Sequence, residues 1–159
     1  MKKINQDYIN IVVKKALEED LKPNGDITSK LMNLTNKKIN ARIIAKQDGV
    51  IAGLSFCKAA FRLIGKETIF SNKILDGAKV KKNKVIAEIK AHTKTILTAE
   101  RTALNFLNHA SGIATLTNEF VQRVNKKTKI CCTRKTTPNL RLLEKYAVKK
   151  GGGYNHRYN

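Results

Sequence analysis

Residues 133–157 read TRKTTPNLRLLEKYAVKKGGGYNHR, and the order of residue types in this stretch predicts the fold around it. The run just before it, residues 129–133, is short and mostly apolar, which is typical of a buried β-strand. Arg134 and Lys135 follow at the point where that strand is predicted to end. The pattern therefore places two cations together at the C-terminal edge of a strand.

A helix is predicted next in the same stretch. The Pro-Asn pair at 138–139 indicates a turn, and from Leu140 the apolar residues recur at helical spacing. This helix is expected to end in a basic turn, with Gly151 as its C′ residue. A second strand is predicted around residues 154–157, and it ends in another cationic pair, His-Arg.

Strand, helix and strand in this order form the beginning of a parallel βα repeat. In barrels built from such repeats, chemistry collects at the C-terminal ends of the strands, where both cationic pairs are predicted to lie. Arginine offers a planar fork that matches carboxylate and phosphate groups, so the two pairs could share one pocket for an anionic substrate. In so basic a chain the same cations are equally compatible with a solvated surface, and the spacing alone leaves both interpretations open.

Further motifs accompany this stretch. They are AERTALNFL at residues 99–107, SGIAT at 111–115, DL at 20–21 and GDIT at 25–28. Together with residues 133–157 they resemble quinolinate phosphoribosyltransferase, also called nicotinate-nucleotide pyrophosphorylase (carboxylating). The resemblance extends over essentially the whole chain, and the combination of motifs is highly specific, whereas TRKT alone would carry little weight.

The resemblance implies roles for individual side chains. Matched to the family's TRKT and NHR signatures, the residues expected to line a dicarboxylate pocket and bind substrate are Arg134, Lys135, Thr136, His156 and Arg157. The four cations among them are the predicted catalytic residues. Arg101 corresponds to an arginine that reaches the site of a neighbouring subunit, which implies a homodimer or a higher homo-oligomer. The other histidines, His92 and His109, are expected to be structural.

The reaction that the resemblance implies joins two polyanions. Quinolinate reacts with phosphoribosyl pyrophosphate to give nicotinate mononucleotide, pyrophosphate and carbon dioxide, a step of de novo NAD biosynthesis. Cations placed beforehand would offset the repulsion between the two substrates. Mg²⁺ is expected to enter with phosphoribosyl pyrophosphate, and no metal ligand is assigned within this chain.

Two features depart from the family's pattern. Cys132 stands directly before Thr133, where this family usually has an acidic residue, so a carboxylate partner for the cations is missing. The family's later lysine, its acidic residues near the ribose and metal, and its glycine-rich phosphate loops would all follow Asn159. The chain is therefore expected to be an N-terminal portion that lacks part of the active site and does not catalyse the reaction alone.

The whole sequence predicts two parts. Residues 1–110 are expected to form an α+β, sandwich-like domain, and residues 111–159 the start of an incomplete α/β barrel. The periodicity of apolar residues in the first part predicts helices near 9–21 and 56–64 and strands near 39–45 and 85–89.

Three local features refine this prediction. Thr98 is the predicted N-cap of the helix that leads into the second part. Ser111-Gly112 is expected to break or kink that helix. Asp48-Gly49 is predicted to form a hairpin-type turn between two strands.

Charge and cysteine usage bound the possible partners. The formal net charge is +20, from 32 Lys and Arg against 12 Asp and Glu, which favours acidic partners. A basic nucleic-acid-binding protein is one alternative, although no interleaving of aromatic and basic residues supports it. A second alternative is a paralogue with another substrate, such as the molybdenum-transport-associated pyrophosphorylase-like proteins.

Three cysteines in this arrangement fit neither a disulfide framework nor a zinc site. Without a signal-peptide pattern or a membrane-length apolar run, a cytoplasmic protein with no membrane partner is expected.

Overall fold

The computed structural model describes residues 4–27, 35, 37–125 and 127–157. The first element is helix α1 (Gln6–Leu21), whose N-cap Asn5 accepts a hydrogen bond from the backbone N–H of Asp7 at 2.8 Å. Its buried face is formed by Ile9, Val13 and Leu17, which confirms the helix predicted from their spacing. Thr28 of the GDIT motif lies outside the described residues.

The main sheet has three antiparallel strands in the order β1 (Lys38–Ile44), β5 (Val85–His92) and β3 (Ile69–Asn72). In the central strand β5 the residues Ile86, Ala87, Ile89 and Ala91 are buried, so this strand contributes more core residues than either of its neighbours. The strands β1 and β5 are those the sequence predicted. Strand β3 was not predicted, because its four residues are too few to establish an alternating pattern.

A second, two-stranded sheet pairs β2 (Gly49–Val50) with β4 (Lys79–Val80). The predicted hairpin at Asp48-Gly49 is therefore wrong, because β1 pairs with β5 and β2 pairs with β4. Asp48 instead ties the two edges of this sheet together: its carboxylate accepts hydrogen bonds from the Lys81 ammonium at 2.7 Å and the Lys82 N–H at 2.9 Å. The bond from Lys81, followed by that from Lys82, lowers the pKa of Asp48.

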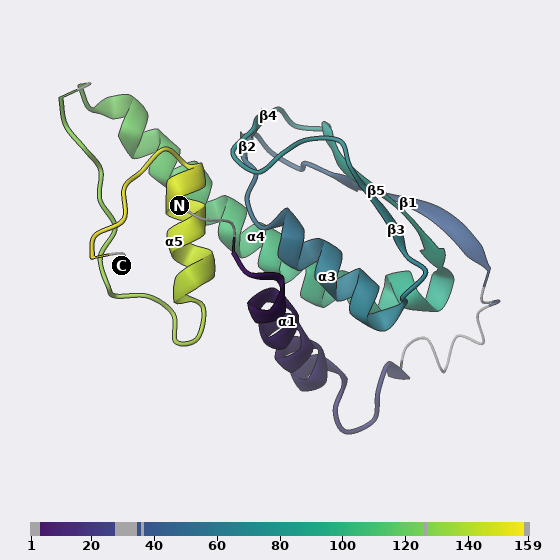
Figure 1. The fold of residues 1–159 in the computed structure, drawn as a ribbon. Coiled ribbons are helices and arrows are strands. Elements are labelled where there is room, and N and C mark those ends of the chain that lie inside the picture. The colour runs from purple at the N-terminus through teal and green to yellow at the C-terminus, as the bar shows by residue number, and fades with distance from the viewer. Residues whose placement is uncertain (1–3, 28–34, 36, 126, 158–159) are drawn as a thin grey trace.

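Helix α3 (Leu54–Ile64) occupies the middle of the N-terminal part and confirms the helix predicted near residues 56–64; Gly65 is its C-cap. The strands lie over one side of α3 and α4, and α1 lies on the opposite side of α3 (Figure 1). Phe56 packs on Phe106 of α4 with ring centroids 5.4 Å apart, and Phe61 packs on Phe70 of β3 at 6.0 Å. The buried aromatic and aliphatic side chains of the helices and the sheet therefore form one core.

Helix α4 (Thr93–Arg123) is continuous over 31 residues, so the predicted break at Ser111-Gly112 is wrong. The Ser111 hydroxyl does not disrupt the helix, because it accepts from the Ala52 N–H at 3.1 Å and donates to the Ala52 carbonyl at 3.2 Å. Thr98 lies inside the helix and is not its N-cap; its hydroxyl donates to the Asp26 carboxylate at 2.6 Å. The division of the chain at residue 110, which this helix crosses, stays a prediction.

Helix α5 (Arg141–Lys150) confirms the helix predicted after the Pro-Asn turn. It packs against the second half of α4, away from the main sheet (Figure 1). Gly151 is the C-cap, and Gly152, with a φ of 91°, takes the left-handed C′ position that was predicted for Gly151. The strands predicted around α5 are reduced to one parallel bridge between Cys131 and Tyr154.

Candidate anion site at the ends of two parallel segments

The Cys131–Tyr154 bridge decides where the predicted cations lie. The Cys132 N–H donates to the Tyr154 carbonyl at 2.9 Å, and the Tyr154 N–H donates to the Ile130 carbonyl at 2.8 Å. Because the bridge is parallel, both segments leave it in the same direction. Arg134 is the third residue after Cys131, and Arg157 is the third after Tyr154. The two arginines therefore occupy equivalent positions of neighbouring segments, and all four residues of the two cationic pairs are exposed.

A cavity of about 330 Å³ lies beside the first pair. Of the predicted site residues, Lys135 and Thr136 line it. Its other walls come from α4, α5 and the turn between them: His109, Ile113, Cys132, Thr133, Thr137, Glu144, Lys145 and Val148. Arg134, His156, Arg157 and Arg101 are not among the lining residues.

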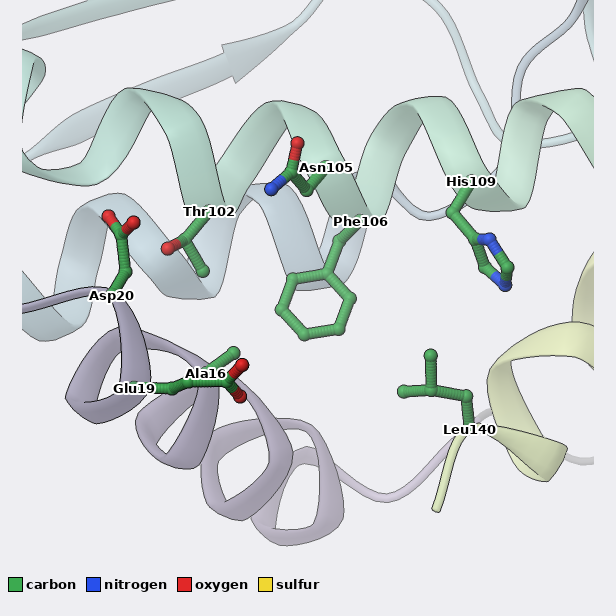
Figure 2. Close-up of a pocket in the computed structure, with 8 residues that line it drawn as sticks. All are labelled: Ala16, Glu19, Asp20, Thr102, Asn105, Phe106, His109 and Leu140. Carbon is green, nitrogen blue, oxygen red and sulfur yellow. The ribbon is translucent and has the colours of Figure 1, made fainter. Parts of the chain in front are cut away.

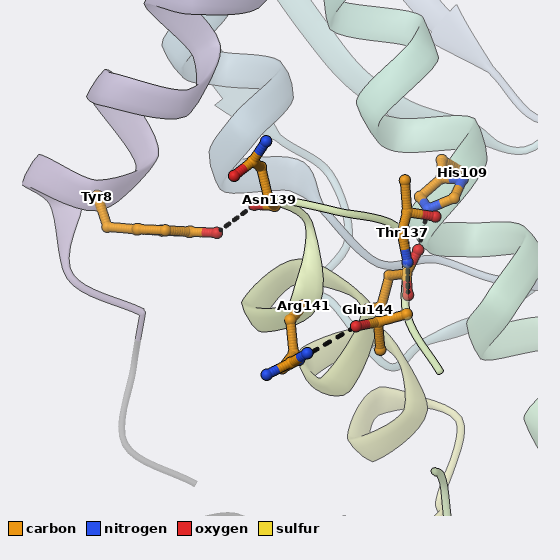
Figure 3. A network of polar contacts seen from close by, with 7 residues as sticks. Tyr8, His109, Thr137, Asn139, Arg141 and Glu144 are labelled. Carbon is orange, nitrogen blue, oxygen red and sulfur yellow. Dashed lines mark hydrogen bonds and ion pairs between the residues drawn. The ribbon is translucent and has the colours of Figure 1, made fainter. Parts of the chain in front are cut away.

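The turn that carries Lys135 and Thr136 is held by polar contacts. The Thr137 N–H donates to Glu144 at 3.2 Å, and the other oxygen of Glu144 lies 3.0 Å from Nε2 of His109 (Figure 3). The Tyr8 hydroxyl donates to the Asn139 carbonyl at 3.0 Å, which joins α1 to the same turn (Figure 3). His109 was expected to be structural, and it serves as one wall of the cavity through its contact with Glu144.

The turn is also fixed from within. The Thr136 hydroxyl accepts from the Arg141 guanidinium at 3.1 Å, and the Lys135 N–H donates to the Thr133 hydroxyl at 3.1 Å. With the hydroxyls of the TRKT motif engaged in these bonds, the motif's cations are carried on a backbone of defined shape.

Lys145 is the residue that the sequence analysis missed. It is only 3% exposed, although it lies on α5 in the middle of the motif. Its ammonium donates to the Cys132 sulfur at 3.2 Å and to the His156 carbonyl at 3.0 Å. The spacing gave no signal for its burial, because Lys145 lies two residues from each of Leu143 and Ala147 and so falls on the opposite side of the helix, where a lysine is ordinarily exposed.

Arg101 lies elsewhere, on the part of α4 that faces α1. Its side chain is 72% exposed and forms an ion pair of 2.9 Å with Asp20. The hydrogen bond that the guanidinium donates to Asp20 raises the pKa of Arg101 above its ordinary value. Eight residues separate Arg101 from His109, which corresponds to about 12 Å along the helix axis. Arg101 thus does not join the cavity beside Lys135 within this chain.

Asp20 also borders the larger cavity of about 510 Å³ between α1 and α4 (Figure 2). That cavity is lined by Ala16, Glu19, Asp20, Thr102, Asn105, Phe106, His109 and Leu140. His109 lines both cavities, so they lie on neighbouring parts of the same face of α4.

The described residues show neither a metal cluster nor a membrane-spanning helix. Within residues 4–27, 35, 37–125 and 127–157, no group of three or more His, Cys, Asp or Glu side chains is arranged to hold a metal ion. Over the same ranges, no helix combines the length and apolar character needed to cross a bilayer.

Comparison with known proteins gives a consistent result. The family model for the N-terminal domain of quinolinate phosphoribosyl transferase matches residues 26–111, and that for its C-terminal domain matches residues 113–159. A probable nicotinate-nucleotide pyrophosphorylase (carboxylating) of Bacillus subtilis is 44% identical over 137 residues, covering 84% of this chain and 46% of the relative. A probable nicotinate-nucleotide pyrophosphorylase (carboxylating) of Methanocaldococcus jannaschii is 42% identical over 157 residues, covering 96% of this chain and 53% of the relative.

Solved structures agree with this match. The crystal structure of NadC from Streptococcus pyogenes superposes with a TM-score of 0.92 at 40% identity, covering 98% of this chain and 56% of that one. The nicotinate-nucleotide pyrophosphorylase of Francisella tularensis superposes with a TM-score of 0.91 at 38% identity, covering 97% of this chain and 54% of that one. Fold and matches together define an α+β domain followed by the beginning of an α/β barrel.

The chain belongs to the quinolinate phosphoribosyl transferase family. It spans about half the length of the curated relatives it matches.

Proposed function

We propose that this chain provides the dicarboxylate-binding side of a site that transfers a phosphoribosyl group to quinolinate. The whole protein would convert quinolinate and phosphoribosyl pyrophosphate to nicotinate mononucleotide, pyrophosphate and carbon dioxide, in the cytoplasm. The observation that carries this proposal is the parallel bridge at Cys131 and Tyr154, after which both cationic pairs follow on neighbouring segments.

The chemistry of the site suits this reaction. Quinolinate has two adjacent carboxylates, and the proposed ligands Arg134, Lys135, His156 and Arg157 come as two neighbouring pairs of cations. Arginine can bind a carboxylate through two parallel hydrogen bonds, and Thr136 adds a hydroxyl at the edge of the cavity. Cations already in place offset the repulsion between two polyanionic substrates as they approach each other.

Mg²⁺ would enter as part of the second substrate, bound to the diphosphate of phosphoribosyl pyrophosphate. The described residues offer no set of ligands for it. The role of this chain lies in charge compensation and positioning.

Arg101 would act in a second copy of the protein. It is exposed and lies outside the cavity of its own chain, so a partner subunit is the place where it could reach a substrate. In this proposal the protein is a homodimer or a higher homo-oligomer, and the ion pair with Asp20 holds the guanidinium at the surface before association.

The test is a calorimetric titration of the chain with quinolinate, comparing Arg134→Ala with Arg123→Ala. Both changes remove one exposed arginine, but Arg123 lies at the last turn of α4 and outside the proposed site. We expect roughly a tenfold or greater loss of affinity for Arg134→Ala and a small change for the control, since charge-assisted contacts are worth about 1.5–3 kcal/mol. Equal losses would indicate nonspecific attraction by the basic surface and would reject the site.

The same titration separates the alternatives. Tighter binding of another dicarboxylate or oxyanion would favour a paralogue with a different substrate. Affinity for a nucleic acid that falls steeply with salt, without affinity for quinolinate, would favour a nucleic-acid-binding protein.

A further inference from the structure

Lys145 is a buried cation on the short helix between the two cationic pairs. Only 3% of its surface is exposed, although it lies on the side of α5 opposite to the apolar face formed by Leu143 and Ala147. Burying a lysine costs solvation of the ammonium and rotamer freedom of a long side chain. Such a residue persists when specific hydrogen bonds offset that cost, so its acceptors indicate what it does.

Those acceptors belong to the two segments that carry the proposed site. Cys132, whose sulfur accepts at 3.2 Å, is two residues before Arg134. His156, whose carbonyl accepts at 3.0 Å, is itself one of the proposed ligands. One ammonium group therefore bonds to both segments, just beyond the bridge that brings them together.

Asn155 completes the link between helix and segments. Its amide donates to the carbonyl of Lys145 at 3.1 Å, and its side-chain oxygen accepts from the Cys132 thiol at 3.3 Å. Cys132 thus acts as donor to Asn155 and as acceptor from Lys145, two roles that one thiol group can combine. Helix α5 and both segments form a single hydrogen-bonded unit.

We propose that Lys145 is a positioning residue that sets the separation and relative orientation of Arg134/Lys135 and His156/Arg157. This inference rests on the proposed dicarboxylate site and deepens it. Two carboxylates on neighbouring ring positions require cations at one particular spacing. The link through Lys145 therefore determines which isomer of a pyridine dicarboxylate the site prefers, and not merely how strongly it attracts anions.

The first experiment compares Lys145→Met with Lys14→Met. Both changes remove one ammonium and keep a long unbranched side chain, but Lys14 is exposed on α1, far along the chain from the site. Calorimetry would give the affinities for the 2,3- and the 2,5-isomer of pyridine dicarboxylate. We expect Lys145→Met to reduce the preference between isomers by about tenfold, as expected when a residue that orients ligands is lost. Lys14→Met should leave the preference unchanged.

If Lys145 contributed to stability alone, Lys145→Met would lower the affinities for both isomers by the same factor and preserve the ratio between them. That result, or an equal change in Lys14→Met, would overturn the positioning role. If the unchanged chain binds neither isomer, the proposed function fails, and the link through Lys145 is then judged by the second experiment.

The second experiment is amide hydrogen exchange, which needs no ligand. In Lys145→Met the Cys132 and Tyr154 amides should lose protection together by about tenfold, while amides of β5 keep theirs. The variant Cys132→Asp offers Lys145 a carboxylate, a stronger acceptor than sulfur, and should increase protection of the same two amides. Unchanged protection in both variants would show that the segments are held without Lys145 and would reject the proposal.

Discussion

The N-terminal part of the chain and the unit formed by α5 with its flanking segments are stabilised in different ways. The N-terminal part closes around apolar side chains from α1, α3, α4 and both sheets, with Phe56 and Phe61 at its centre. Helix α5 buries only Leu143, Lys145 and Ala147, and its flanking segments meet at one bridge. Apolar burial is nondirectional and supplies stability, whereas the polar links around Lys145 are directional and supply geometry. The region that presents cations is thus fixed in shape without a large core of its own.

The contact between α5 and α4, which joins the two regions, depends on the absence of a side chain at Gly151. A Cβ on Gly151 would collide with the carbonyl oxygen of Ala114 on α4 and lie 2.7 Å from the Cβ of Thr117. The Asn118 amide donates to the Gly151 carbonyl at 3.1 Å across the same contact. The absence of a side chain at Gly151 therefore lets the chain approach α4 closely.

The largest effect is expected from Phe56→Ala. Phe56 is fully buried and touches Phe106 and Tyr8, so its truncation should lower the free energy of unfolding by about 3–5 kcal/mol. Urea denaturation followed by circular dichroism measures this loss. Leu63→Ala is the control, since Leu63 is 41% exposed on the same helix and should cost much less. Similar losses at both positions would contradict a core centred on α3.

A smaller effect, confined to the second region, is expected from Gly151→Ala. The added methyl group must push α5 away from α4, so we expect a loss of about 1–3 kcal/mol. Hydrogen exchange should show α5 losing protection before the sheet does. Gly112→Ala is the matched control: nothing lies within 4 Å of its Cβ position, and alanine should stabilise α4 by about 0.5–1 kcal/mol. Destabilisation by both changes would mean that the close approach of Gly151 to α4 does not explain the loss of stability in Gly151→Ala.

The smallest effect is expected from Asp20→Asn. The ion pair between Asp20 and Arg101 is largely exposed, so water and salt screen it, and the urea midpoint should hardly move. The same measurement in low and high salt checks this reason, because any residual effect should shrink as salt is added. A shift as large as that of Gly151→Ala would show that this surface pair contributes to the core's stability.

Much of the local structure was predictable, and particular residues show why. The spacing of Ile9, Val13 and Leu17 repeats with the period of a helix, and α1 follows it. The Pro-Asn turn and the helix after Leu140 were equally readable. Errors occurred where a side chain had a distant partner: Ser111 bonds to Ala52, and Thr98 bonds to Asp26. A local rule for caps or breaks cannot include a partner that is tens of residues away.

The sequence by itself determined helices α1, α3 and α5, the family and the identity of the cations in TRKT and NHR. These depend on periodicity and on motifs, which are properties of short stretches. Only the tertiary structure decided that β1 pairs with β5, that α4 runs unbroken past Gly112, and that Arg101 lies apart from the cavity beside Lys135. It alone brought Lys145 against Cys132 and His156. The physical reason is that pairing and burial depend on which surfaces meet after folding, and one helix presents the same pattern of residues whatever packs against it.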